Sequence, residues 1–179
     1  MTASRTGPNG PGPAAGVKPG EHPWGDKGQV IALAVFLAVW ILDSFVFRIS
    51  TFLARSVGLA IRLAASGLVM ALAVYLIQGG HRATSHEAGP TPALIDDGAF
   101  ARMRHPLYAG SILFYLALVL STLSLAALAV WIGLFVFYDV IASYEERWLV
   151  AAIGVPYEDY RRRVPKWVPR CAVRRRPRR

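Results

Sequence analysis

Apolar residues gather into long runs that short polar segments separate. The first two runs, Gln29–Phe47 and Val57–Ile77, are each long enough to cross a bilayer at 1.5 Å per residue. A third stretch of about 38 mostly apolar residues is interrupted only at 121–124, and it fits two short spans, Leu107–Leu120 and Leu123–Tyr144. The pattern therefore predicts an all-α, polytopic membrane bundle of about four transmembrane helices, the last two forming a C-terminal hairpin.

The polar segments divide the chain into five parts. Glycine, proline, alanine and serine dominate the first residues, a composition typical of disorder. Turn signals such as Gly-Gly, Gly-Pro and Thr-Pro mark the segment after the second run. We predict a disordered tail (1–27), two transmembrane helices (28–78), a cytosolic loop (79–103), a catalytic hairpin with the cofactor-binding region (104–170) and a basic tail (171–179).

Each of the first two spans carries one charged residue, Asp43 or Arg62. If residues 48–56 form a short turn, the two positions lie at similar depth. We therefore expect them to pair near the outer ends of their helices. A charge inside a membrane span is also a candidate functional site, but pairing gives a sufficient structural reason for both.

Charge and composition fit a membrane protein. The chain has 179 residues, 54% of them hydrophobic, with a net charge of +9 and a single cysteine, Cys171, which excludes an internal disulfide framework. Eleven lysines and arginines follow from Arg147 onward, and the turn between the last two spans has none. The positive-inside rule then places both termini and the loop 79–103 in the cytoplasm. We expect the membrane to be the plasma membrane of a prokaryote. We expect the basic tail to contact anionic lipid headgroups rather than nucleic acid, since no recognition module accompanies it.

Two ionisable clusters flank the hairpin, Arg104-His105 before it and Glu145-Glu146 after it. His105-Pro106 predicts a helix start, because proline is preferred at the first helical position. A tight hairpin returns both clusters to the same membrane face. One side of the resulting pocket would bind an anion, through Arg104, His105 and the helix N-terminus. The other side, through the carboxylates of Asp139, Glu145 and Glu146, would bind a hydroxyl or a cation. S-adenosylmethionine matches such a pocket, as does a phosphorylated dinucleotide.

Beyond the hairpin, Gly154-Val155-Pro156 predicts the end of the fourth span, and Tyr157–Arg163 predicts a short amphipathic helix at the cytosolic membrane surface. His81 and His86 lack partners at metal-ligand spacing, so we expect both to be solvated loop residues and expect no metal site.

The segment Arg104–Gly110, RHPLYAG, resembles the RHPxYxG signature of the isoprenylcysteine carboxyl methyltransferase family, whose relatives include membrane phospholipid methyltransferases. The segment 94–100, with its Leu, Gly and aromatic residue, resembles that family's lead-in. Glu145-Glu146 with Leu149 looks like its EExL element. Gly154, Tyr157 and Tyr160, followed by Val164-Pro165, look like the pattern that comes next.

The resemblance implies an integral membrane methyltransferase that binds S-adenosylmethionine on the cytosolic side, releases S-adenosylhomocysteine and methylates a lipophilic small molecule or lipid. It assigns seven residues to the cofactor pocket: Arg104, His105, Tyr108, Glu145, Glu146, Tyr157 and Tyr160. A carboxylate acceptor needs only a cation, such as Arg104 or Arg161, whereas an amine acceptor needs a base, such as Glu145 or Glu146. The sequence leaves both acceptors open, and it does not predict the oligomeric state.

Two other functions compete with this interpretation. A sterol-type reductase that uses NADPH carries a similar Arg-His-Pro signature, but those proteins are larger and typically have Asn where this chain has Leu107. A non-enzymatic membrane protein could retain the pocket as a sensor or scaffold. Ligand binding separates the first alternative, and turnover separates the second.

Overall fold

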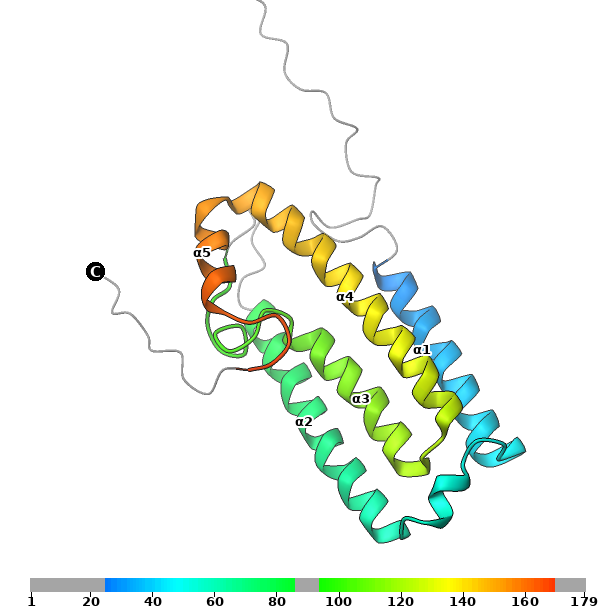
Figure 1. Cartoon of the computed structure of the whole chain (residues 1–179). Helices are drawn as coiled ribbons and strands as arrows, with labels where there is room; N and C mark the ends of the chain where they lie inside the picture. Colours follow the sequence, from blue (N-terminus) through cyan, green and yellow to red (C-terminus); the bar gives the residue numbers. More distant parts are fainter. Residues whose placement is uncertain (1–24, 86–93, 170–179) are drawn as a thin grey trace, which may run out of the picture.

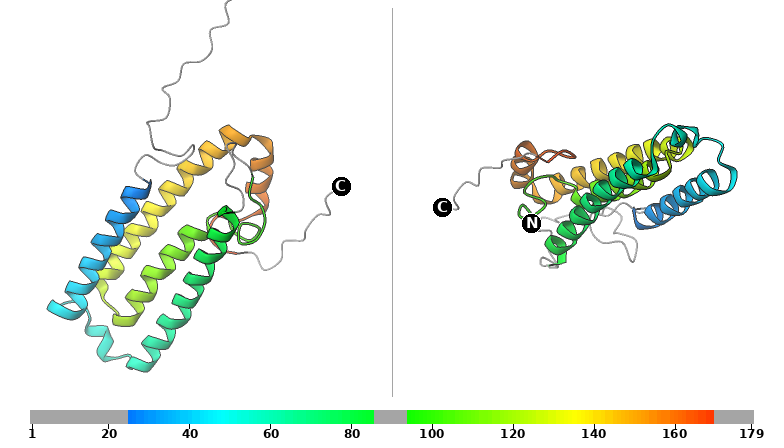
Figure 2. Two further views of the ribbon diagram at one scale, coloured as in Figure 1. Left: turned by 180° about the vertical axis from the view of Figure 1, so that it is seen from behind. Right: turned by 90° about the horizontal axis from the view of Figure 1, so that it is seen from below.

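The computed structural model describes residues 25–85 and 94–169, and the structural statements below concern these residues. Four long helices run side by side: α1 (Gly25–Ile41), α2 (Leu59–Ser85), α3 (Pro106–Thr122) and α4 (Leu125–Ile153). Across the bundle their order is α2, α3, α4, α1, and the short helix α5 (Val155–Arg163) covers the end where α3 begins (Figure 1). The view from behind shows the same row (Figure 2). The prediction of an all-α membrane bundle is confirmed.

Three of the four predicted spans are long and apolar enough to cross a membrane: Lys27–Phe47, Leu59–Ala83 and Leu125–Ile153. The first combines α1 with a π-helical segment, Leu42–Phe47. The remaining predicted span, α3, is apolar but has only 17 residues, which gives it a length of about 25 Å. It is also the helix enclosed by its neighbours, since none of its residues is classed as exposed.

Several helix boundaries differ from those predicted. The helix α2 continues to Ser85, so the first part of the predicted loop 79–103, including His81, is helical. A polar helix end gives no hydrophobic signal, which explains the early boundary. The helix α4 continues past the end of the predicted span at Tyr144 to Ile153, directly before the predicted stop at Gly154. His86, Cys171 and the tails at 1–24 and 171–179 lie outside the described residues.

Local sequence sets the limits of the hairpin as expected. Pro106 is the first residue of α3, after His105 at the N-cap. The Ser124 side chain caps α4 by accepting a hydrogen bond from the backbone N–H of Ala127 at 3.0 Å. At the other end of α4, Gly154 has φ +75°, a backbone conformation that favours glycine, and α5 follows directly. The predicted helix stop at Gly154 and the short helix after it are confirmed.

Glycine allows α2 and α3 to pack closely. A Cβ atom at Gly110 would lie 2.6 Å from a side-chain carbon of Ile77 and 3.0 Å from the carbonyl oxygen of Ala73. Likewise, a Cβ atom at Gly80 would lie 2.7 Å from Leu107. The pair therefore approaches more closely than larger residues would permit, and α3 is held firmly at the centre of the bundle.

The predicted ion pair between Asp43 and Arg62 is not formed. Asp43 instead accepts hydrogen bonds from the backbone N–H of Ser50 at 3.0 Å and from the hydroxyl of Ser124 at 2.6 Å. Arg62 donates to the carbonyl oxygen of Ser121 at 3.1 Å. Depth alone suggested the pair, but the two serines reach Asp43 through the turns that flank the spans. We call Asp43, Ser50, Ser124 and their hydrogen bonds the Asp43 cluster.

Candidate functional site

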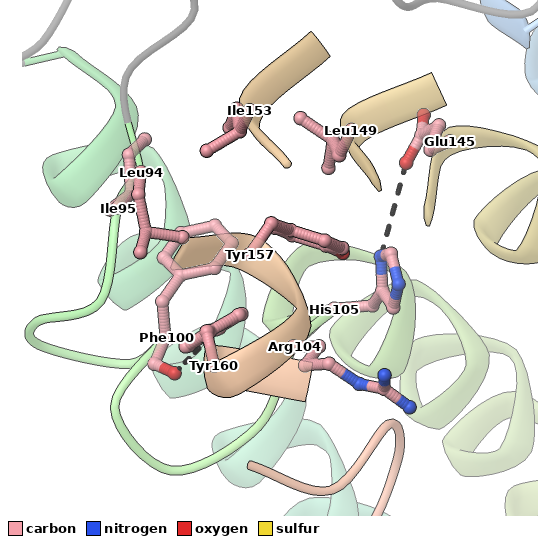
Figure 3. Close-up of a pocket in the computed structure, with 10 residues that line it drawn as sticks. All are labelled: Leu94, Ile95, Phe100, Arg104, His105, Glu145, Leu149, Ile153, Tyr157 and Tyr160. Atoms are coloured by element: carbon pink, nitrogen blue, oxygen red, sulfur yellow. Dashed lines mark hydrogen bonds and ion pairs between the residues drawn. The ribbon is translucent and has the colours of Figure 1, made fainter. Parts of the chain in front are cut away.

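The candidate site lies where α3 begins, at the end of the bundle opposite the Asp43 cluster. Residues come to it from the segment 94–105, from the first turn of α3, from the last turns of α4 and from α5 (Figure 3). Because α4 has 29 residues and α3 has 17, α4 extends past the start of α3 and carries α5 over the site (Figure 1). The hairpin thus brings the two predicted ionisable clusters together.

Glu146 on α4 faces both members of the first cluster. Its Oε1 atom lies 3.0 Å from Nε2 of His105, and its Oε2 atom lies 3.2 Å from Nη1 of Arg104. All three groups are largely removed from solvent, with side-chain exposures of 10% for Glu146, 7% for His105 and 12% for Arg104. A carboxylate here compensates a guanidinium that burial would otherwise leave uncompensated.

Burial decides the charge of His105. Desolvation lowers the pKa of its imidazole below the usual 6.5, and the hydrogen bond to Glu146 opposes this only partly. A neutral ring that donates from Nε2 to Glu146 has its acceptor atom at Nδ1. That atom lies 3.9 Å from Oε2 of Glu145. The dashed line in Figure 3 marks this approach.

Glu145 occupies a different position from its neighbour. Its side chain accepts a hydrogen bond from the hydroxyl of Tyr108 on α3, and it is 21% exposed, about twice as much as Glu146. Glu145 also lines both cavities described below, which Glu146 does not. The two glutamates, which the sequence could not distinguish, therefore differ: Glu146 holds Arg104 and His105, and Glu145 borders open space.

Aromatic residues form the wall that faces these charges. Tyr157 and Tyr160 on α5 are each 3% exposed, and their ring centroids lie 5.7 Å apart. The Tyr160 hydroxyl donates to the carbonyl oxygen of Phe100 at 2.8 Å, which ties α5 to the segment before α3. Desolvation raises the pKa of both tyrosines, so both remain neutral hydrogen-bonding groups at physiological pH.

Two cavities adjoin at this end of the bundle. The first has a volume of about 150 Å³ between the segment 94–105, α4 and α5, and the second has about 210 Å³ beside the first turn of α3. Four residues line both: Phe100, Arg104, His105 and Glu145. Taken together, the two volumes slightly exceed the lower limit of roughly 300 Å³ for small-molecule sites.

Arg104 has hydrogen-bonding capacity to spare. Its Nε and Nη1 atoms are buried, and neither makes a hydrogen bond among the described residues, although Nη1 lies close to Glu146. An unsatisfied buried donor is costly and calls for an explanation. Since the Arg104 side chain lines both cavities, its positive charge suits an anionic group bound there.

The structure brings together most of the predicted site residues, but not Arg161. Five line one or both cavities with Arg104: His105, Tyr108, Glu145, Tyr157 and Tyr160. Glu146 lies behind Arg104 and His105 and contacts both. Arg161 is exposed on α5 and lines neither cavity. An acceptor group in either cavity would therefore meet Arg104 rather than Arg161.

Asp139, expected among the carboxylates of the pocket, lines neither cavity and instead forms a polar group beside the site with two residues that the sequence analysis did not identify. The ammonium of Lys166 donates to the Asp139 carboxylate, to the Asp139 carbonyl oxygen at 3.1 Å and to the Ser143 hydroxyl at 2.8 Å. Trp167 donates from its indole nitrogen to Oδ1 of Asp139 at 2.9 Å. Lys166 and Trp167 lie after α5 in a segment without hydrophobic periodicity, where no sequence pattern marks them. Only Asp139, inside an apolar span, was conspicuous.

Comparison with known proteins bears on the class of this site. Residues 53–154 match the profile of the Phospholipid methyltransferase family, which covers more than half of the chain. The match includes the Arg104-His105 cluster, the hairpin and the Glu145-Glu146 cluster. The chain belongs to this family, and it is an integral membrane protein.

One curated relative is Methanethiol S-methyltransferase 2 of Bradyrhizobium diazoefficiens. It is 40% identical over 74 residues, which make up 41% of this chain and 28% of the relative. The match thus spans less than a third of the length of that protein. No solved structure matches the chain.

Proposed function

We propose that this protein binds S-adenosylmethionine in the two cavities at the start of α3 and uses it to methylate a lipophilic acceptor. The observation that carries this proposal is the constellation of Arg104, His105 and Glu145 around the shared space, in a chain of this family. S-adenosylmethionine supplies a methyl group on a sulfonium, and S-adenosylhomocysteine is the product.

The residues present fit this ligand. The guanidinium of Arg104, which lines both cavities, would hold its carboxylate. Glu145 would accept from its ammonium or from a ribose hydroxyl, and the Tyr108 hydroxyl keeps that carboxylate in place. The aromatic wall of Phe100, Tyr157 and Tyr160 would enclose the adenine.

The chain's own residues then have two tasks. Methyl transfer is an in-line displacement, so alignment of the reactants and exclusion of water matter most. The roof of α5 and the apolar residues Leu94, Leu149 and Ile153 exclude water from the first cavity. A carboxylate acceptor needs only the cation Arg104, whereas an amine or thiol acceptor must lose a proton, and Glu145 or Nδ1 of His105 is the nearest base.

We further propose that the site faces the cytoplasm of a prokaryotic cell, because basic residues concentrate at this end of the chain. The acceptor would approach from the bilayer that surrounds the bundle. The name of the Bradyrhizobium relative adds a small thiol to the lipids and lipophilic carboxylates that merit a test as acceptors.

Calorimetric titration of detergent-purified protein with S-adenosylhomocysteine and with NADPH tests the proposal. We expect micromolar binding of S-adenosylhomocysteine, about −8 kcal/mol, that is lost in His105→Ala and in Glu146→Gln. Asp159→Asn is the matched control, because Asp159 is an exposed carboxylate on α5 that lines neither cavity. Binding of NADPH alone would overturn the proposal in favour of a reductase. Binding without turnover on any acceptor class would favour a sensor.

A further inference from the structure

A short segment after α5 lies across the site and is fastened to α4. We call residues 164–167 the strap. Its first residue, Val164, packs with Tyr157 and Tyr160 in an apolar cluster. Its last two, Lys166 and Trp167, make all their side-chain hydrogen bonds described here to Asp139 and Ser143, one turn apart on α4.

The strap also contacts both residues of the first ionisable cluster. The carbonyl oxygen of Pro165 accepts a hydrogen bond from the backbone N–H of Arg104 at 3.0 Å. The Trp167 ring lies 5.9 Å from the His105 ring, centroid to centroid. Trp167 packs as well against the apolar cluster that contains Met103, directly before Arg104. The strap thus touches the backbone of one site residue and the ring of the next.

The other contacts described for the Arg104 and His105 side chains come from α3 and α4: Tyr108 stacks on His105, and Glu145 and Glu146 face the two side chains. Both residues precede α3, so their backbone N–H groups make no hydrogen bond within that helix. The one described hydrogen bond from these N–H groups runs from Arg104 to Pro165. Glu146 contacts only their side chains. A loop residue keeps a defined position when its neighbours are themselves fixed, and Asp139 provides that fixed point on a long helix.

We propose that Asp139, Lys166 and Trp167 form a clamp that sets the positions of Arg104 and His105 for ligand binding. The three are positioning residues, since none of them lines either cavity. Lys166 and Trp167 join the strap to Asp139 by two independent hydrogen-bonded contacts, so each can hold the strap when the other is removed. The proposal rests on the proposed function of the same site.

The test compares Lys166→Met, Trp167→Phe and the double variant in full-length, detergent-purified protein. Methionine keeps most of the apolar stem of Lys166 and removes its charge, and Asp139, 44% exposed, can remain solvated. Phenylalanine keeps an aromatic ring beside His105 and removes the indole N–H. Val168→Ala is the control, because Val168 is the next residue and is 74% exposed.

Two readouts are needed, and one of them requires no ligand. Hydrogen exchange of the Arg104 amide reports its bond to Pro165, and calorimetry reports the affinity for S-adenosylhomocysteine. We expect each single variant to speed exchange and weaken binding about threefold and the double variant to do so about thirtyfold, since a misplacement of 1 Å can cost about a hundredfold. Lys166→Arg, which keeps a cation and its donors, should restore both values, with the unfolding temperature unchanged.

The outcomes separate this proposal from the proposed function. Unchanged exchange at Arg104 in the double variant overturns the clamp, whatever the affinity. Faster exchange with unchanged affinity also overturns it, because the strap would then hold Arg104 without serving the pocket. Faster exchange in a protein whose wild type binds no S-adenosylhomocysteine would support the contact and overturn the function.

Discussion

Buried carboxylates stand at both ends of the bundle, but they are satisfied by different partners. Asp43, at 7% exposure, accepts hydrogen bonds only from neutral donors, which include the hydroxyls of Ser50 and Ser124. Glu146, which is equally buried when the whole residue is counted, faces a guanidinium and an imidazole instead. The contrast distinguishes two uses of a carboxylate.

The Asp43 cluster closes on itself. Ser50 and Ser124 donate to Asp43 and also accept from the first backbone N–H groups of α4, at Ala126 and Ala127. Each hydroxyl is thereby used as donor and as acceptor. The cluster joins the π-helical end of the first span to the turn between α3 and α4. Arg62 lies outside the cluster, and its Nε atom makes no hydrogen bond among the described residues.

The site end does not close. Arg104 keeps two buried donor atoms without hydrogen bonds, and two cavities adjoin it. Arg104 and His105 lie directly before the first turn of α3. Contacts from α4 and from the strap hold them there. A buried arginine donor without a hydrogen bond occurs at each end, so the cavities that Arg104 lines, and not the donors alone, indicate a binding role at the site end.

The largest effect should come from Asp43→Ala. Removal of the carboxylate leaves the hydroxyls of Ser50 and Ser124 and one backbone N–H without their acceptor, which costs about 3 kcal/mol in the free energy of unfolding. Thermal unfolding in detergent measures this loss. The affinity of the folded protein for S-adenosylhomocysteine should stay within about twofold of wild type. A variant with wild-type stability and weakened binding would reverse the comparison.

Arg104→Lys should produce the opposite result. Lysine keeps the positive charge beside Glu146 but lacks the planar guanidinium, which can bind Glu146 and a second anion at the same time. We expect S-adenosylhomocysteine to bind about 30-fold more weakly, with little change in the unfolding temperature. Arg162→Lys, on the exposed side of α5, controls for the substitution itself. Full affinity in Arg104→Lys would mean that no anion meets these donors.

The smallest effect concerns pH. Because burial lowers the pKa of folded His105 below 6.5, the unfolded chain takes up a proton at this residue before the folded protein does. The free energy of unfolding should therefore fall as the pH drops from 6.5 towards the lower folded pKa, and this contribution should be constant above 6.5. Unfolding experiments on wild type and His105→Gln, run from pH 8 to pH 5, measure the difference. A steeper loss in His105→Gln would contradict the assigned neutral ring.

Hydrophobic patterning predicted most of the fold. The apolar runs located all four long helices, and Pro106 and Gly154 located the start of α3 and the end of α4, because those residues act locally on the backbone. The limits of α2 were less visible, since its last turns are polar. Motif spacing across the hairpin also predicted that Arg104-His105 would meet Glu145-Glu146, which depends only on the lengths of two adjacent helices.

Partners that come from turns could not be predicted. Ser50 and Ser124 displaced Arg62 as partners of Asp43 because the path of each turn, and not the depth of each charge, decides which donors arrive. Lys166 and Trp167 reach Asp139 from 27 and 28 residues away through an irregular segment. Asp139 was conspicuous in the sequence as a charge inside an apolar span, but no sequence pattern marked Lys166 and Trp167 as its partners.

The difference in length between α3 and α4 has a consequence for where two kinds of solvent meet. With 17 residues against 29, α3 is about 18 Å shorter than α4, so α4 continues past the start of α3. The first turn of α3 therefore lies in a recess, which consists of the two cavities bordered by α4 and α5. On the proposed function, a lipophilic acceptor would reach this recess from the bilayer and S-adenosylmethionine would reach it from the water. Arg104 and His105 would then lie where the two phases meet.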